Sequence, residues 1–90
     1  MKMFKHLISS STSQQVDVLM REDAVIRAVG VQDGQVYAWA ETPGGDPLTI
    51  TRRFRVIGTG WDVPDPGVYL GTVFSAPFVW HVYEIETWSS

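Results

Sequence analysis

An Asp-Gly pair at residues 33 and 34 separates two runs of alternating character, Val25–Gln32 and Gln35–Glu41. A two-residue turn that matches the twist of flanking strands needs positive φ angles, which Gly adopts freely and Asp tolerates. Alternation with a period of two places apolar side chains on one face of a strand. The pair therefore predicts a tight β-hairpin with a type I′ turn, and it constrains the fold more than any other segment.

The same strand-like pattern continues along the chain. Five further segments are rich in β-branched and aromatic residues, namely Met3–Ile8, Gln14–Met20, Leu48–Ile57, Val68–Ser75 and Phe78–Thr87. Turn-forming residues separate them, as in Ser9–Ser13, Thr42–Pro47 and Gly58–Gly67. About seven strands at short intervals predict an all-β fold, a small antiparallel β-sandwich or open barrel.

The chain length sets the size of the core. Ninety residues predict a single domain over residues 1–90 with one two-layer core, to which four Trp, four Phe and three Tyr contribute large apolar surfaces. Eight residues on apolar strand faces are expected in it: Val16, Val18, Val29, Val31, Phe54, Val56, Leu70 and Val82. A domain this small often gains stability by self-association, so we expect a homo-oligomer, with a two-fold dimer favoured.

Charge and composition narrow the function classes. The net charge of −3 argues against general nucleic-acid binding, which needs a basic surface. There is no cysteine, so disulfides and thiolate metal sites are excluded. No segment approaches the roughly 20 apolar residues that cross a bilayer, and the N-terminus lacks the apolar stretch of a signal peptide. We expect a cytoplasmic protein without a membrane segment.

The segment Phe54–Trp61 is the first candidate site, because a strand runs there into a glycine-hinged loop. Gly58 and Gly60 permit close backbone approach, and Trp61 offers a rigid apolar plane beside Thr59. The loop has neither the further glycine nor the helix of a phosphate-binding motif.

Three arginines precede this loop. Arg53 and Arg55 share one strand face, whereas Arg52 shares the other face with Phe54 and Val56. Two arginines at that spacing are able to hold a phosphate or carboxylate. The alternative, which we favour, is a solvated face on which they pair with acidic residues of a neighbouring strand.

His81 is the main candidate for acid–base chemistry. Alternation places His81 and Tyr83 on one face of their strand, and Trp80, Val82 and Glu84 on the other. An enzymatic function would depend on His81 with Tyr83 or Glu84, and a half-buried, hydrogen-bonded structural histidine is the alternative. No His/Asp/Glu cluster has metal-ligand spacing, and we expect no cofactor.

The remaining aromatic residues leave one question open. Tyr37 and Trp39 share one face of their strand, opposite Val36, Ala38 and Ala40. We favour Tyr37 and Trp39 as the core face because few other large residues are available to fill a sandwich, and an exposed aromatic stripe is the alternative. Trp61 and Trp88 lie in a loop and near the C-terminus, and we expect one of them at an interface or pocket mouth.

Several segments together resemble a known family. The most specific are Val56–Gly60, Tyr69–Thr72 and His81–Glu84, and Met3–His6 and Val29–Ala40 contribute as well. With these segments the chain resembles a family of short proteins, many encoded by bacteriophages and prophages, whose function is not assigned. The resemblance implies a compact β-fold and supplies no catalytic residues. Trp61 and Trp88 depart from the family pattern.

The function expected from this sequence is non-enzymatic binding. A phage-type accessory protein would bind and inhibit or sequester a host or defence component, either a protein or a small anionic, nucleotide-like ligand. Its expected contact residues are Arg53, Arg55, Gly58, Thr59, Gly60, Trp61, His81 and Tyr83. A structural or assembly role in the virion is the alternative.

Overall fold

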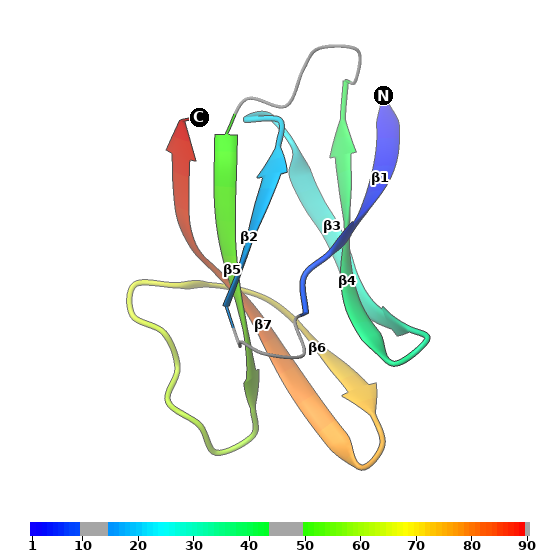
Figure 1. Ribbon diagram of the computed structural model, residues 1–90, viewed down its shortest axis with the longest axis vertical. Helices are drawn as coiled ribbons and strands as arrows, with labels where there is room; N and C mark the ends of the chain where they lie inside the picture. The colour runs from blue at the N-terminus through cyan, green and yellow to red at the C-terminus, as the bar shows by residue number, and fades with distance from the viewer. Residues whose placement is uncertain (10–14, 44–49, 90) are drawn as a thin grey trace.

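Seven antiparallel β-strands make up the computed structural model, which describes residues 1–9, 15–43 and 50–89 (Figure 1). They are β1 (Lys2–Leu7), β2 (Gln15–Met20), β3 (Val25–Gln32), β4 (Gln35–Thr42), β5 (Ile50–Gly58), β6 (Val68–Ser75) and β7 (Phe78–Ser89). The described part of the chain contains no helix, and therefore none long and apolar enough to cross a membrane. The predicted all-β class and the number of strands are confirmed.

The strands form two sheets. One has the order β1-β4-β3, and the other has the order β2-β5-β7-β6. Asp33 and Gly34 join β3 to β4 with φ angles of 52° and 75°, which confirms the predicted hairpin with its two positive φ values. The loops predicted at Ser9–Ser13 and Thr42–Pro47 lie largely outside the described residues.

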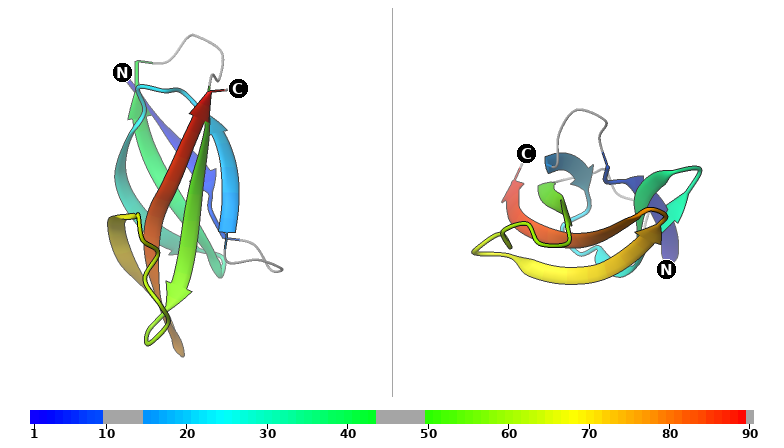
Figure 2. Two further views of the ribbon diagram at one scale, coloured as in Figure 1. Left: turned by 90° about the vertical axis from the view of Figure 1, so that its left-hand side faces the viewer. Right: turned by 90° about the horizontal axis from the view of Figure 1, so that it is seen from below.

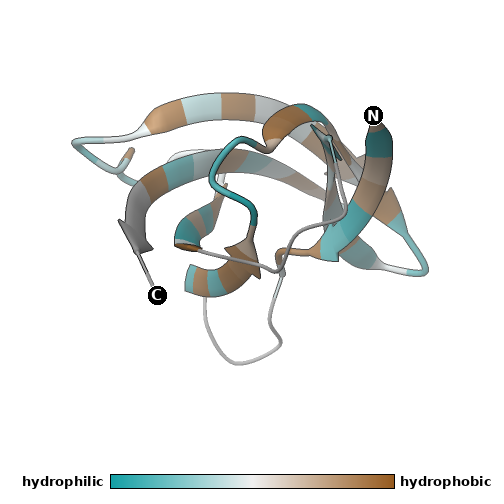
Figure 3. Ribbon diagram, turned by 90° about the horizontal axis from the view of Figure 1, so that it is seen from above, coloured by the Kyte–Doolittle hydropathy of each residue, from teal (hydrophilic) through white to brown (hydrophobic). Residues whose placement is uncertain are grey.

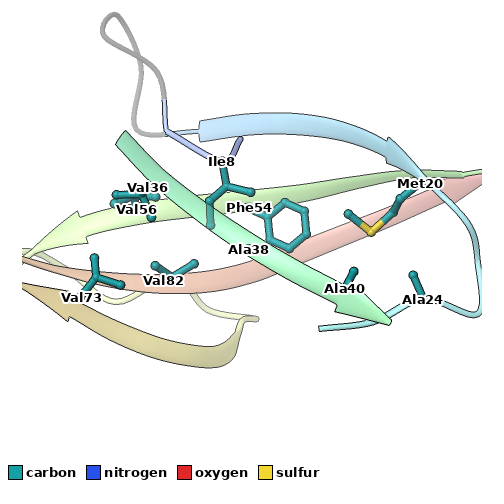
Figure 4. Close-up of a cluster of buried hydrophobic side chains, with 10 residues drawn as sticks. All are labelled: Ile8, Met20, Ala24, Val36, Ala38, Ala40, Phe54, Val56, Val73 and Val82. Atoms are coloured by element: carbon teal, nitrogen blue, oxygen red, sulfur yellow. The ribbon is translucent and has the colours of Figure 1, made fainter. Parts of the chain in front are cut away.

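The core lies between the two sheets (Figure 4). Val36, Ala38 and Ala40 of β4 face Phe54 of β5 and Val82 of β7, and all five are at most 4% exposed. Hydrophobic and hydrophilic residues alternate along several strands in Figure 3, as expected for strands with one buried face. Val56, which was predicted from the sequence, and Ile8, Met20, Ala24 and Val73, which were not, complete the cluster.

Most of the predicted core residues do contribute to it. Phe54, Val56 and Val82 are buried, and the half-buried Val18, Val29, Val31 and Leu70 pack against the cluster. Val16 is only half-buried and lies outside the cluster, near the start of the edge strand β2.

The prediction that Tyr37 and Trp39 of β4 face the core is wrong. Tyr37 and Trp39 lie half-buried on the outer face of the three-stranded sheet, and Ala38 and Ala40 point inward. The small alanines are inside because large side chains of the opposite sheet, including Phe54 and Met20, fill that space (Figure 4). Trp39 instead lies against Gly30, where a Cβ atom would be 3.2 Å from the indole ring.

Two features shape the molecule around this core. On one side β3 approaches β6 so closely that a Cβ atom on Gly71 would lie 2.6 Å from a methyl group of Val29. At one end β5, β6 and β7 extend past the turn between β3 and β4 (Figures 1 and 2). We call this end of the four-stranded sheet the distal end. Its inner face is not covered by the three-stranded sheet.

Candidate functional site

The predicted strand residues share the outer face of the four-stranded sheet. Arg53 and Arg55 alternate with the buried Arg52, Phe54 and Val56, so they point outward. Arg55 lies opposite Tyr83 in the register between β5 and β7. His81 and Tyr83 flank the buried Val82, so they share one face of β7, as predicted from the alternation, and the register places them on the same outer face as Arg55.

Both outward arginines interact with side chains of β2. Arg53 forms an ion pair with Asp17, with Nε donating to Oδ1 at 2.7 Å, and this hydrogen bond lowers the pKa of Asp17. Arg55 donates to the side-chain oxygen of Gln15 at 3.2 Å. These contacts match the favoured alternative, a solvated face with pairing across strands, rather than a preformed anion site.

His81 is held between two threonine hydroxyl groups. Its Nε2 lies 2.9 Å from Oγ1 of Thr59 in the loop after β5, and its Nδ1 lies 3.0 Å from Oγ1 of Thr72 in β6. The Tyr69 hydroxyl lies 2.6 Å from the same Thr72 oxygen. A hydroxyl group both donates and accepts, so the hydroxyl groups of Thr59 and Thr72 satisfy either tautomer of the imidazole.

Tyr83 and Glu84, the residues predicted to act with His81, make other contacts. Tyr83 contacts Tyr69, with ring centroids 5.5 Å apart. Glu84 points inward, where its carboxylate receives two hydrogen bonds from Arg52, at 2.6 and 2.7 Å. Arg52 also donates to the Ala24 carbonyl, so this ion pair joins β5, β7 and the start of β3 within the sandwich.

Trp61 lies on the opposite side of the sheet from His81. Its backbone N–H donates to the Gly58 carbonyl at 3.2 Å, which closes a turn. Its indole ring contacts Trp80 in a T-shaped arrangement with centroids 5.9 Å apart. Trp80 precedes His81 and shares the inner face with Val82, so the structure does not bring Trp61 and the Arg53/Arg55 face together.

Trp61, Phe78 and Trp80 form a group of rings at the distal end, here called the distal aromatic cluster. Phe78 stacks on Trp80 with centroids 5.3 Å apart and an interplanar angle of 23°. Trp80 also packs against the core, whereas Trp61 and Phe78 remain 46% and 55% exposed. The cluster is therefore anchored by one half-buried ring and presents two accessible ones.

A family model described as a domain of unknown function, DUF7352, matches residues 1–89. The chain belongs to the DUF7352 family. Comparison with curated proteins and with solved structures gave no match.

The sequence analysis of this DUF7352 protein missed part of the site. Phe78 was not selected, and Trp80 was noted only for its strand face. One signal was available: Phe78 and Trp80 are two residues apart on one strand face, and residues 68–80 contain no charged side chain. The side chain of Trp88, the other candidate for an interface or pocket mouth, lies outside the described part of the chain.

Proposed function

We propose that this protein is a non-enzymatic binding protein whose contact surface is the distal aromatic cluster. The observation that carries this proposal is the partial exposure of Trp61 and Phe78 around the anchored Trp80. Trp is among the residues enriched at binding hot spots, and rigid rings lose little conformational entropy on binding. The cluster lies at one end of the sheet, where a partner reaches it without disturbing the core.

The geometry favours a protein partner over a nucleotide-like ligand. A nucleotide would need an aromatic ring for its base and an arginine for its phosphate within one site. Here Trp61 and the Arg53/Arg55 pair lie on opposite faces of the sheet, and Arg53 is engaged with Asp17. Rings without a neighbouring cation lack the phosphate contact that a nucleotide needs, and they suit side chains of another protein.

We extend this proposal to the biological setting that the family resemblance suggests. The protein acts as a phage-type accessory protein in the host cytoplasm, where it binds and inhibits or sequesters a host or defence component. Sequestration needs only a complementary surface. The distal aromatic cluster supplies such a surface.

Affinity capture with matched variants tests this function. The wild-type protein and the Phe78→Ser and Phe74→Ser variants are immobilised and exposed to host lysate. Phe74 is 76% exposed and lies on the opposite face of the same hairpin, so its replacement is a control for lost surface hydrophobicity. We expect Phe78→Ser to lose a partner that Phe74→Ser retains, with unchanged thermal midpoints. Equal capture by all three proteins would count against the proposal.

A role in virion assembly is the second candidate, and one observation favours it. Met3, Phe4 and Leu7 of the edge strand β1 are 53%, 44% and 46% exposed on its two faces, which gives an apolar sheet edge separate from the distal end. A structural subunit needs two such surfaces to contact two neighbours. Proteomic analysis of purified particles separates the roles, since an assembly subunit is present in them and a cytoplasmic effector is absent.

A further inference from the structure

We propose that the distal aromatic cluster, together with Asp62 and Asp65, recognises a cationic segment of the partner protein, one that presents arginine or lysine side chains. This inference rests on the proposed function and specifies the chemistry of the partner. It follows from the distribution of charge along the chain, the state of the two carboxylates and the exposure of the rings.

Charge is strongly segregated between the two parts of the chain. All seven Lys and Arg residues lie between positions 2 and 55. Residues 58–81 form the distal loop and the β6–β7 hairpin, and their formal charges are only the carboxylates of Asp62 and Asp65. The distal end therefore has a negative potential, which favours a positively charged partner.

The two distal carboxylates differ from four acidic residues elsewhere in the fold, which form ion pairs with arginine. Asp17, Asp23, Glu41 and Glu84 each pair with an arginine at 2.6 to 3.1 Å. Asp62 and Asp65 are exposed and have no ion-pair or hydrogen-bond partner among the residues that the structure describes. Asp62 directly follows Trp61, so an unneutralised carboxylate and an exposed indole ring belong to neighbouring residues of the same loop.

Aromatic rings beside carboxylates suit a guanidinium or ammonium group. The face of an indole or phenyl ring is electrostatically negative and attracts a cation, and Arg stacks on such faces especially well. The protein already contains one contact of this kind, because Nζ of Lys5 lies 4.6 Å from the centroid of the Tyr37 ring. Trp61 and Phe78 offer comparable rings with no cation of their own chain nearby in sequence.

The same charges argue against a second copy of this chain at the distal end. A two-fold interface centred on the distal aromatic cluster would bring Asp62 and Asp65 of both copies toward each other. Like charges placed opposite one another weaken such an interface. A cationic partner instead neutralises both carboxylates, so we assign the surface to a different protein.

The test uses three flexible peptides of equal length, in which glycine alternates with arginine, citrulline or glutamate. Citrulline keeps the shape of arginine but removes its charge. Binding to the wild-type protein is followed by NMR, from the indole N–H signals of Trp61 and Trp80, with Trp39 on the other sheet as a spectator. We expect the arginine peptide to shift the Trp61 and Trp80 signals and the citrulline peptide to bind about tenfold more weakly. The glutamate peptide should leave both signals in place.

Charge-neutralising variants locate the binding surface. Asp62→Asn and Asp65→Asn should each weaken binding of the arginine peptide about threefold, as expected for exposed ion pairs. Asp33→Asn is the matched control: it removes the same charge at the β3–β4 turn, and Asn tolerates the positive φ of that position. Its affinity for the arginine peptide should equal that of the wild type.

Three outcomes would overturn the inference. The first is an absence of shifts at Trp61 and Trp80 with the arginine peptide, and the second is equal binding of the citrulline peptide. The third is an equal effect of Asp33→Asn and Asp62→Asn, which would indicate attraction to the net charge alone. Failure of this inference is distinguishable from failure of the proposed function. A lysate partner whose capture depends on Phe78 but not on Asp62 or Asp65 would support the binding function and refute only the cationic chemistry of the partner.

Discussion

The indole ring of Trp61 covers Gly58 so closely that a Cβ atom at residue 58 would lie 2.9 Å from the ring. Gly58 is opposite Trp80 in the register between β5 and β7, so the missing side chain makes the space in which Trp61 meets Trp80. One glycine thus determines where the distal aromatic cluster forms.

Gly58→Ala should displace the Trp61 ring from Trp80, because the added methyl group occupies its position. Trp61 is 46% exposed and able to swing toward solvent, so we expect a loss of stability below about 1 kcal/mol. Tryptophan fluorescence should report a more solvated indole, and capture of the partner should weaken. In a Trp61→Ala background the same change should have no further effect on emission, and an additional shift there would contradict the packing argument.

Gly71→Ala should destabilise the fold more severely. The new Cβ atom would lie 2.6 Å from a methyl group of Val29, where β3 and β6 approach each other. Overpacking of this kind typically costs about 1–3 kcal/mol, measurable by chemical denaturation. Val29→Ala removes the obstructing methyl groups, so the double variant should be less destabilised than the sum of the two single variants. Additive costs would show that the two residues do not compete for space.

The fold should tolerate the replacement of both Arg52 and Glu84 by apolar residues, but not the loss of one of the two. Their side chains are 11% and 15% exposed, so Glu84→Ala leaves a mostly buried guanidinium group without its carboxylate. We expect a loss of about 3 kcal/mol in the free energy of unfolding. Replacing both residues, as Arg52→Met with Glu84→Leu, should recover most of that loss. A double variant as unstable as Glu84→Ala would refute this account.

Lowering the pH below neutrality should destabilise the protein through His6. Burial, and to a lesser degree the charge of Arg52, lowers the pKa of His6 below its ordinary value of 6.5. The unfolded chain therefore binds more protons in this range, so stability is full above about pH 6.5 and falls toward the lower pKa of the folded state. His6→Gln should flatten denaturation midpoints over that window. The lowered pKa values of Asp17 and Asp23 act only at more acidic pH, and this part of the profile should persist in the variant.

The homodimer expected from the short chain remains a prediction. The edge strand β1, with exposed Met3, Phe4 and Leu7 on its two faces, offers an edge for it that leaves the distal aromatic cluster accessible. Analytical ultracentrifugation at micromolar concentration should show a species of twice the 10.1 kDa chain mass, and Leu7→Lys should shift it toward the monomer. A single 10.1 kDa species for the wild type would rule this dimer out.

The sequence predicted the strands well because their signals are local. The turn at Asp33 and Gly34 depends on the φ preferences of two residues, and alternation depends on a period of two. The orientation of β4 was not predictable in this way, since Val36–Ala40 is apolar on both faces. Its orientation follows from the opposite sheet, where Phe54 and Met20 leave room only for small side chains.

The candidate site was predicted only in part for a similar reason. Alternation correctly placed His81 and Tyr83 on one face of β7, and Val82 and Glu84 on the other. The hydroxyl partners of His81 come from a loop and from β6, and the position of Trp61 depends on the register between β5 and β7. Such relationships link distant segments and leave no local pattern.

The extension of β5, β6 and β7 past the other sheet separates selection for a stable fold from selection on the distal surface. Most buried residues lie between the sheets, so substitutions at exposed distal positions such as Trp61, Asp62 and Phe78 carry little penalty for folding. Under the proposed function, the binding surface is therefore free to diverge while the scaffold is preserved. A binding protein of this design would follow a changing target through single substitutions that leave its fold stable.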